Sequence, residues 1–222
     1  MKPGSIGLAL IAVFVSGALS PAAAAVITFS FTGTVTSVPV DEVGTGVDFG
    51  TAIEGIYTFE ATADDLIPGG SMASHQMAGP PYGLTVDIGG NLFGTSDSLA
   101  VNVFDGIVDQ YGVLACSGGL DCSGELSIEI FLQDDSGSAL GSDLLPLTPP
   151  DLASFAIRDF HLFTPDGSQP QLQIVGTIDT LVCMEGCAVS APEPGALVLL
   201  STGWGMLALM GWHRRVRLRA RR

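Results

Sequence analysis

The sequence predicts an all-β body, an antiparallel β-sandwich of jelly-roll-like form, and two observations favour it. Between residues 27 and 36 the apolar residues Ile27, Phe29, Phe31 and Val35 alternate with threonines and a serine. A period of two is typical of a strand with one buried face. No stretch of ten residues in the body has the spacing of an amphipathic helix, and Gly, Pro and Asp turns separate the apolar runs. Short strands joined by such turns are typical of sandwiches.

Further alternating runs follow in order along the chain and predict the remaining strands. They cover residues 52–59, 83–88, 99–104, 125–132, 154–163 and 171–181. Gly89-Gly90 separates the run 84–88 from the apolar residues 91–93. Paired glycines supply the positive φ angles of a primed turn, so this segment is expected to form a two-residue hairpin.

Two stretches, residues 64–81 and 136–151, are predicted to be long loops. The first contains Pro68-Gly69-Gly70 and Gly79-Pro80-Pro81, and the second ends in Pro149-Pro150. Loops of this length in a compact domain are usually functional or disordered. A binding surface is therefore sought there, and the alternative is a plain connection across the ends of the sandwich.

The N-terminus is predicted to be a signal peptide of residues 1–25. Lys2 precedes the apolar run 6–15, and Pro21 breaks that run before four alanines. Ala23 and Ala25 satisfy the small-x-small cleavage rule, so the mature chain is expected to begin at Val26 after export through the Sec translocon and cleavage by signal peptidase. A retained N-terminal anchor is the alternative.

The C-terminus combines an uncharged apolar run, residues 195–212, with a basic tail, residues 213–222. As a helix, such a run is about 27 Å long, which suffices to cross a bilayer core. The alternative is a buried helix of a soluble domain, but only Ser201 and Thr202 would supply a polar face. Basic clusters stay on the cytoplasmic side, so the body is expected to face the periplasm. The basic residues of the tail are Arg214, Arg215, Arg217, Arg219, Arg221 and Arg222.

Pro192-Glu193-Pro194 stands immediately before this apolar run. The order of motif, apolar helix and Arg cluster over residues 192–222 resembles the PEP-CTERM sorting signal of Gram-negative bacteria. The resemblance implies processing by an exosortase-type enzyme near the motif and transfer from the inner membrane to the cell surface or extracellular matrix. Proteins with this signal often accompany exopolysaccharide. The chain is thus divided into residues 1–25, an acidic domain of residues 26–190 and a sorting signal of residues 191–222.

The body between the two signals is strongly acidic. Of the 23 acidic residues only Glu193 lies outside residues 26–191, and of the 8 basic residues only Arg158 lies inside. The body therefore carries 22 acids against one base, a net charge of −21. This charge excludes electrostatic attraction to nucleic acid or to anionic lipid headgroups. The apolar content is too high for a disordered acidic segment, so a folded core is expected.

Four cysteines form an even set, as in exported proteins whose thiols pair. Cys116 and Cys122 are close in sequence, and so are Cys183 and Cys187. Local pairing is the economical arrangement, and two other connectivities remain open. Zinc is disfavoured because neither pair has Cys-x-x-Cys spacing.

No catalytic motif is recognised in the body, so an enzyme is not expected. The body has two histidines, and the Gly-x-Ser-x-Gly and His-Glu-x-x-His patterns are absent from the sequence. His75 with Asp64 or Asp65 is a weak candidate for a metal site. Calcium is the least improbable cofactor, with Asp134, Asp135 and Asp143 as candidate ligands. These aspartates lack EF-hand spacing, so no metal and no cofactor are expected.

The sequence therefore predicts an exported surface or matrix protein with a structural or adhesive role beside exopolysaccharide. The alternative is a lectin-like module that binds carbohydrate or calcium, and a secreted hydrolase is a third class. An aromatic platform in a loop would favour the lectin, but the body has no Trp and only Tyr57, Tyr82 and Tyr111.

Overall fold

The computed structural model describes residues 25–119, 122, 126–164 and 170–187. These residues form ten strands and one short 3-10 helix, η1 (Leu152–Ser154). All strand pairs are antiparallel, which confirms the predicted all-β antiparallel body. The strands are β1 (Val26–Asp41), β2 (Ala52–Glu60), β3 (Met72–Met77), β4 (Gly83–Ile88), β5 (Asn91–Thr95), β6 (Ser98–Phe104), β7 (Asp109–Cys116), β8 (Ser127–Asp134), β9 (Ile157–Phe163) and β10 (Leu172–Glu185).

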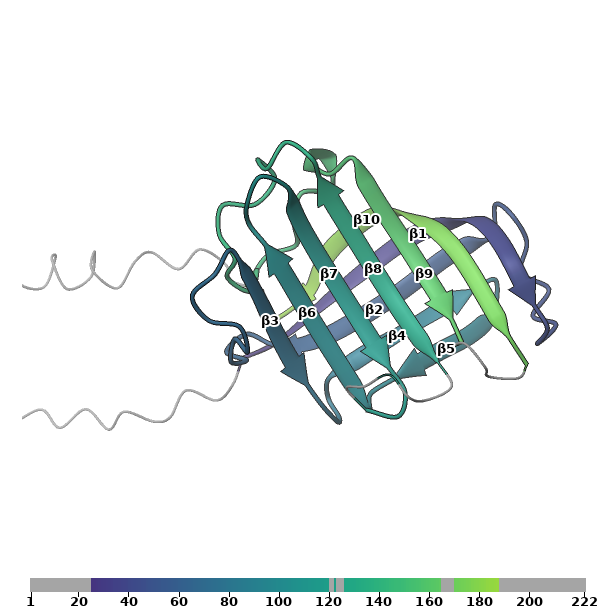
Figure 1. Ribbon diagram of the computed structural model, residues 1–222. Coiled ribbons are helices and arrows are strands. Elements are labelled where there is room, and N and C mark those ends of the chain that lie inside the picture. The colour runs from purple at the N-terminus through teal and green to yellow at the C-terminus, as the bar shows by residue number, and fades with distance from the viewer. Residues whose placement is uncertain (1–24, 120–121, 123–125, 165–169, 188–222) are drawn as a thin grey trace, which may run out of the picture.

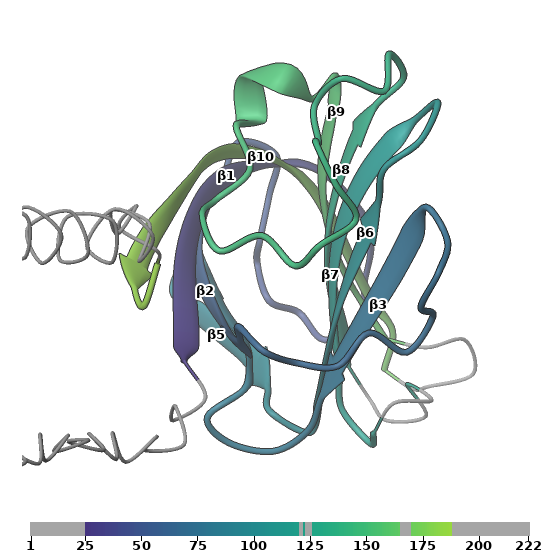
Figure 2. The same cartoon turned by 90° about the vertical axis from the view of Figure 1, so that its left-hand side faces the viewer.

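The ten strands belong to one sheet that curls over itself into two layers. Its order is β3-β6-β7-β8-β9-β10-β1-β2-β4-β5. Strands β3 and β6 to β9 form the front layer of Figure 1, with β10, β1, β2, β4 and β5 behind them. Figure 2 shows the two layers from the side. The sandwich-like form agrees with the prediction, but the order is not that of a jelly roll, because β6 to β10 follow one another as a meander within one sheet.

The first and last strands, β1 and β10, form the seam between the two halves of the sheet. They pair from Thr28 with Glu185 to Asp41 with Leu172, with four register shifts along the way. Extra residues in one strand of a pair bend that strand and increase its twist. The long bulged seam is therefore where the sheet can curl.

The core lies between the layers and is made by the inward members of each alternating run. Phe29, Phe31 and Phe160 are fully buried there. The rings of Phe31 and Phe160 lie 6.1 Å apart and join β1 to β9. The hydroxyls of Tyr57 on β2 and Tyr111 on β7 are 2.9 Å apart, so a buried hydrogen bond also connects the layers. Burial raises the pKa of both hydroxyls, so both stay protonated.

The predicted strand runs agree with β1, β2, β4, β6, β8, β9 and β10, and the Gly89-Gly90 hairpin joins β4 to β5. The loop predicted over residues 64–81 is wrong in part, because β3 lies inside it and pairs along its whole length with β6. Strand β7 has no counterpart among the predicted runs. The first three residues of the predicted run 154–163 belong to η1 and to the turn before β9.

The second predicted loop, residues 136–151, contains no strand in the structure. Two aspartates at facing ends of β7 and β8 hold its start. Asp109 accepts a hydrogen bond from the backbone N–H of Leu140 at 2.8 Å. Asp134 accepts from the N–H groups of Ser138 and Ala139 at 2.9 and 3.1 Å. The loop therefore crosses one end of the sandwich, and Leu145 packs into the core.

The structure has the local disulfide pairing, Cys116 with Cys122 and Cys183 with Cys187. Residues 1–24 of the predicted signal peptide lie outside the described residues. The whole predicted sorting signal, residues 191–222, also lies outside them. Across the part of the chain that the structure covers, no helix has the length and apolar character needed to cross a bilayer.

Candidate functional site

The candidate site lies on the outer face of the layer formed by β10, β1, β2, β4 and β5. Strand register places outward side chains in rows across these strands. One row runs through Val182, Ser30, Ile56, Thr85 and Gly94. Val182 is 49% exposed and Ile56 is 44% exposed. This face therefore mixes exposed aliphatic groups with hydroxyls.

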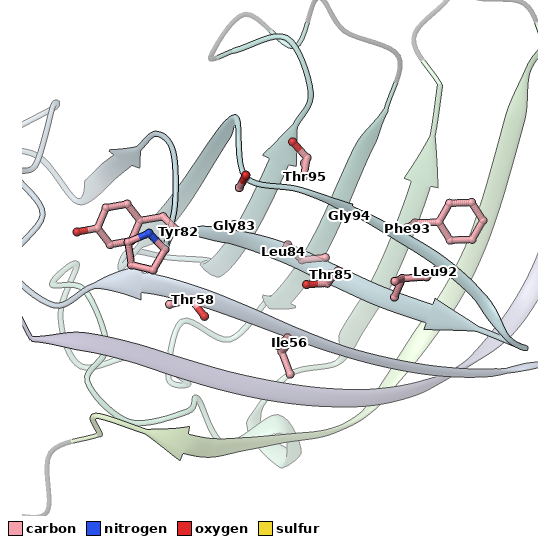
Figure 3. A pocket seen from close by; sticks show the side chains of 12 residues that line it. Ile56, Thr58, Tyr82, Gly83, Leu84, Thr85, Leu92, Phe93, Gly94 and Thr95 are labelled. Atoms are coloured by element: carbon pink, nitrogen blue, oxygen red, sulfur yellow. The ribbon is translucent and has the colours of Figure 1, made fainter.

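Two hollows adjoin on this face, and we call them together the outer groove. Their volumes are about 520 and 530 Å³, and both are open to solvent. They share Ile56, Thr85 and Leu92. Figure 3 shows Tyr82 at one end of the first hollow and Leu92 towards the other, with side chains of β2 and β4 between them. The other lining residues are Thr58, Pro81, Gly83, Leu84, Phe93, Gly94, Thr95 and Ser96 in the first hollow, and Ser30, Phe31, Thr32, Glu54, Gly55, Val86 and Asp87 in the second.

The second hollow carries two carboxylates side by side. Glu54 on β2 is the register partner of Asp87 on β4, and both side chains are exposed. Directly opposed residues of an antiparallel pair have Cβ atoms about 5 Å apart. The same row continues to Thr32 on one side and to Leu92 on the other. Two acceptors thus stand between a hydroxyl and an apolar side chain.

The first hollow ends at a half-buried tyrosine. The hydroxyl of Tyr82 donates to Oε2 of Glu60 at 2.9 Å. This hydrogen bond raises the pKa of Tyr82, because it stabilises the protonated hydroxyl, and burial and the charge of Glu60 act in the same direction. The ring lines the end of the first hollow.

The chemistry of the lining residues suits binding better than bond cleavage. A retaining or inverting glycosidase uses a carboxylate pair in which apolar surroundings keep one acid protonated. Glu54 and Asp87 have suitable proximity, but both are exposed and neither has such shielding. The two lining sets contain no histidine, cysteine or basic residue. The groove offers hydrogen-bond acceptors, hydroxyls and aliphatic contact area.

The structure does not assemble the calcium candidates into one site. Both oxygens of Asp134 are occupied by N–H and O–H donors of Ser136 and Ser138 and by the N–H of Ala139. The backbone donors of Ser138 and Ser136 lower the pKa of Asp134 to about 2. Asp135 accepts from the side chain of Gln133. Among the described residues, these aspartates and Asp143 form no metal-ligating group.

Hydrogen bonds to turn backbones explain much of the acidic composition. Asp41, for example, accepts from the N–H groups of Gly44, Thr45 and Gly46 in the loop after β1. These bonds lower the pKa of Asp41, with the Thr45 N–H as the largest cause. Other aspartates that accept from turn N–H groups are Asp65, Asp87, Asp97, Asp109, Asp134 and Asp151.

The two body histidines lie on strands. His75 is buried on β3, where its Nδ1 donates to the carbonyl oxygen of Ala63 at 2.8 Å. Its Nε2 is buried and has no hydrogen-bond partner among the described residues. His161 lies on β9 with Nε2 4.0 Å from a carboxylate oxygen of Asp159. Neither histidine lines the outer groove.

Of the other predicted site residues, Pro192, Glu193, Pro194 and the tail arginines lie outside the described residues. The outer groove lies mainly on strands, whereas a binding surface was predicted in the loops 64–81 and 136–151. Two features of the sequence mark the groove: Thr32 among the outward residues of β1, and Ile56, an apolar residue at an outward position of β2. Comparison with protein families, curated proteins and solved structures finds no match to this chain. The site must therefore be interpreted from its geometry.

Proposed function

We propose that this protein is an exported component of the cell surface or extracellular matrix of a Gram-negative bacterium, with a structural or adhesive role beside exopolysaccharide. In this proposal the apolar helix at residues 195–212 anchors the body in the inner membrane on its periplasmic side. An exosortase-type enzyme then acts near Pro192-Glu193-Pro194 and releases the body to the surface. The observation that supports the export part is a disulfide-bonded acidic body between two targeting patterns.

The observation that carries the polysaccharide contact is the outer groove. It is open along its length and joins hydroxyls, the Glu54–Asp87 acceptors and the exposed side chains of Ile56 and Leu92. Sugar rings present hydroxyl donors around apolar C–H faces, and such a ligand matches both properties of the lining. An open groove accommodates an extended chain at many points along that chain.

The aromatic residues favour this role over a lectin with a defined pocket. Tyr57 and Tyr111 are fully buried and bonded to each other, so only Tyr82 of the three tyrosines reaches the groove. The other two aromatic residues of the lining, Phe31 and Phe93, are packed in or against the core, so the groove has no platform of exposed rings for one bound sugar. The groove therefore fits weak, repeated contact with a polymer better than tight capture of one residue.

Intact mass of the protein recovered from cells and from the medium tests the sorting part. We expect a chain that begins near Val26 and ends near Pro194. A recovered chain that still carries Arg222 would refute the processing step and leave a membrane-anchored protein.

Cosedimentation with the exopolysaccharide of the producing cell tests the groove. Ile56→Asp places a charge on the floor of both hollows, and we expect at least about tenfold weaker binding, roughly 1.4 kcal/mol. Ile107→Asp is the matched control, because Ile107 is 90% exposed and lines neither hollow. Equal loss of binding in both variants would show a general charge effect and refute the groove as the contact.

A further inference from the structure

The two edges of the curled sheet differ in how their backbone groups are satisfied. At the β3 edge the segment before the strand folds over it. The N–H of Leu66 donates to the carbonyl of Ser74 at 2.9 Å, and the N–H of Ser74 donates to Oδ1 of Asp65 at 3.0 Å. Asp65 also forms a β-bridge with His75. This edge is therefore covered by the protein's own chain.

Within the described ranges, no segment covers the β5 edge in this way. Ile88 faces Asn91 across the two-residue Gly89-Gly90 turn, so Asn91, Phe93 and Thr95 direct their backbone groups towards β4. The N–H and C=O groups of Leu92 and Gly94 then point away from the sheet. Among the described residues, no hydrogen bond to these four groups is found.

β5 also lacks the features that normally prevent strand pairing at an edge. Exposed edges are usually blocked by charged side chains, by proline or by a bulge. The sequence of β5, Asn-Leu-Phe-Gly-Thr, contains neither a charge nor proline, and its register with β4 has no shift. Leu92 on this strand is 74% exposed. The edge is thus open, regular and apolar.

We propose that β5 pairs with β5 of a second copy of this chain, antiparallel and about a two-fold axis at Phe93. In this register Leu92 of each copy faces Gly94 of the other, and each such pair exchanges two backbone hydrogen bonds. The arrangement uses the four free groups of each strand. It also sets the exposed leucine beside a residue without a side chain, where the Thr85 methyl lies close to the position a Cβ would take.

The distribution of charge limits where a second copy can approach. Two bodies with a net charge of −21 each repel, so contact between them is least unfavourable along a strand that carries no carboxylate. β5 is such a strip, since its five residues are all uncharged. A cationic partner would find no carboxylate on this strand and would be drawn to other surfaces. A neutral strand of the same sequence matches β5 in both charge and shape.

Two properties of the dimer follow. The interface is far smaller than the roughly 1,600 Å² of a standard complex, so the association is weak. It also tightens as salt rises, because the repulsion between the two acidic bodies is screened over about 10 Å at 0.1 M and about 3 Å at 1 M ionic strength. The pairing brings the outer grooves of the two copies next to each other at Leu92. The proposed dimer does not depend on whether the groove binds polysaccharide.

Sedimentation equilibrium of the protein isolated from cells, at 0.05 and 0.5 M NaCl, tests the pairing. We expect a monomer–dimer equilibrium that strengthens with salt. Leu92→Asp adds a like charge at the axis and is expected to weaken the dimer by roughly tenfold or more. Ile107→Asp makes the same change at a 90% exposed site away from β5 and is expected to leave the dimer intact. A monomer under all conditions, or equal weakening by both variants, would overturn the proposal.

Crosslinking tests the register without relying on the charged variant. Residues 93 of the two strands form a non-hydrogen-bonded pair with Cα atoms about 4.5 Å apart, which is within disulfide range. Phe93→Cys is therefore expected to give a covalent dimer on mild oxidation. In the Asn91→Cys control the two thiols are offset by about 13 Å along the strands and should not join. Crosslinking of the control but not of Phe93→Cys would refute this register.

Discussion

Removal of one hydroxyl from the Tyr57–Tyr111 pair should destabilise the protein more than removal of both. The two oxygens are 2.9 Å apart and both side chains are fully buried between the layers. In Tyr57→Phe the remaining hydroxyl has lost its partner in an apolar core, and an unsatisfied buried polar group costs about 1–3 kcal/mol. Tyr111→Phe should cost a similar amount for the same reason.

The double variant Tyr57→Phe/Tyr111→Phe replaces both polar groups with C–H of nearly the same shape. Such paired replacement is often nearly neutral, so we expect a loss of about 0–1 kcal/mol. The two single losses would therefore not add, and the sum of the single losses should exceed the loss in the double variant by roughly 1–6 kcal/mol. Urea unfolding with the disulfides intact, followed by far-UV circular dichroism, measures all four proteins of this cycle.

Additive losses would refute the reasoning. If the double variant lost the sum of the two single values, each hydroxyl would be stabilised by something other than its partner. The m-value serves as the internal control, because an altered slope would indicate a changed denatured or native state instead of a lost hydrogen bond.

Three further predictions concern a turn, a disulfide and a glycine. Asp134 has a pKa of about 2 against an ordinary 3.8, so its stabilising effect is present above pH 4 and is lost as pH falls towards 2. Asp134→Asn should lower the free energy of unfolding at pH 7, and its thermal midpoint should fall less than that of the wild type between pH 4 and pH 2. An equal fall of the midpoint in both proteins over this range would contradict this. Replacement of Cys116 and Cys122 by serine should cost about 2 kcal/mol in urea unfolding through the lost loop constraint. Gly55→Ala places a Cβ against the Phe31 ring in the core and should cost about 1–3 kcal/mol. Gly141→Ala, where a Cβ meets nothing within 4 Å, should change stability little, and equal losses in the two alanine variants would count against the packing argument.

The fold could be predicted where large residues mark the buried face of a strand. In β1 the inward positions are Ile27, Phe29, Phe31 and Val35, so the period of two is plain in the sequence. The hairpin was visible for a different reason, since Gly89 and Gly90 both adopt positive φ angles of 61° and 90° that few other residues accept.

The missed strands lack these signals. The buried face of β3 carries Ala73, His75 and Met77, and none of these is β-branched or one of the aromatic residues enriched in strands. Its pairing with β6, and not its own sequence, makes it a strand. In β7 the outward Gly112 and the small Ala115 dilute an otherwise regular alternation. Local propensity is a weak guide where the partner strand supplies the stabilisation.

The outer groove could not be predicted because it depends on register between strands. Glu54 and Asp87 are far apart in sequence and face each other only because β2 pairs with β4 in one particular alignment. The crossing from β2 to β4 skips β3, which leaves for the opposite layer. A single sequence indicates which face a residue occupies but not which residue of another strand lies beside it.

The seam between β1 and β10 determines when this protein can fold. A chain that is exported from its N-terminus delivers β1 first and β10 last, yet these two strands are neighbours at the centre of the sheet. Until the chain is available as far as Glu185, β1 lacks one of its two partners, and no hydrogen-bonded strand pair joins β9 to β1. Contacts between residues so distant in sequence form slowly, because the loop between them must close first. On the export route proposed above, the sheet would therefore remain incomplete until β10 has crossed the membrane.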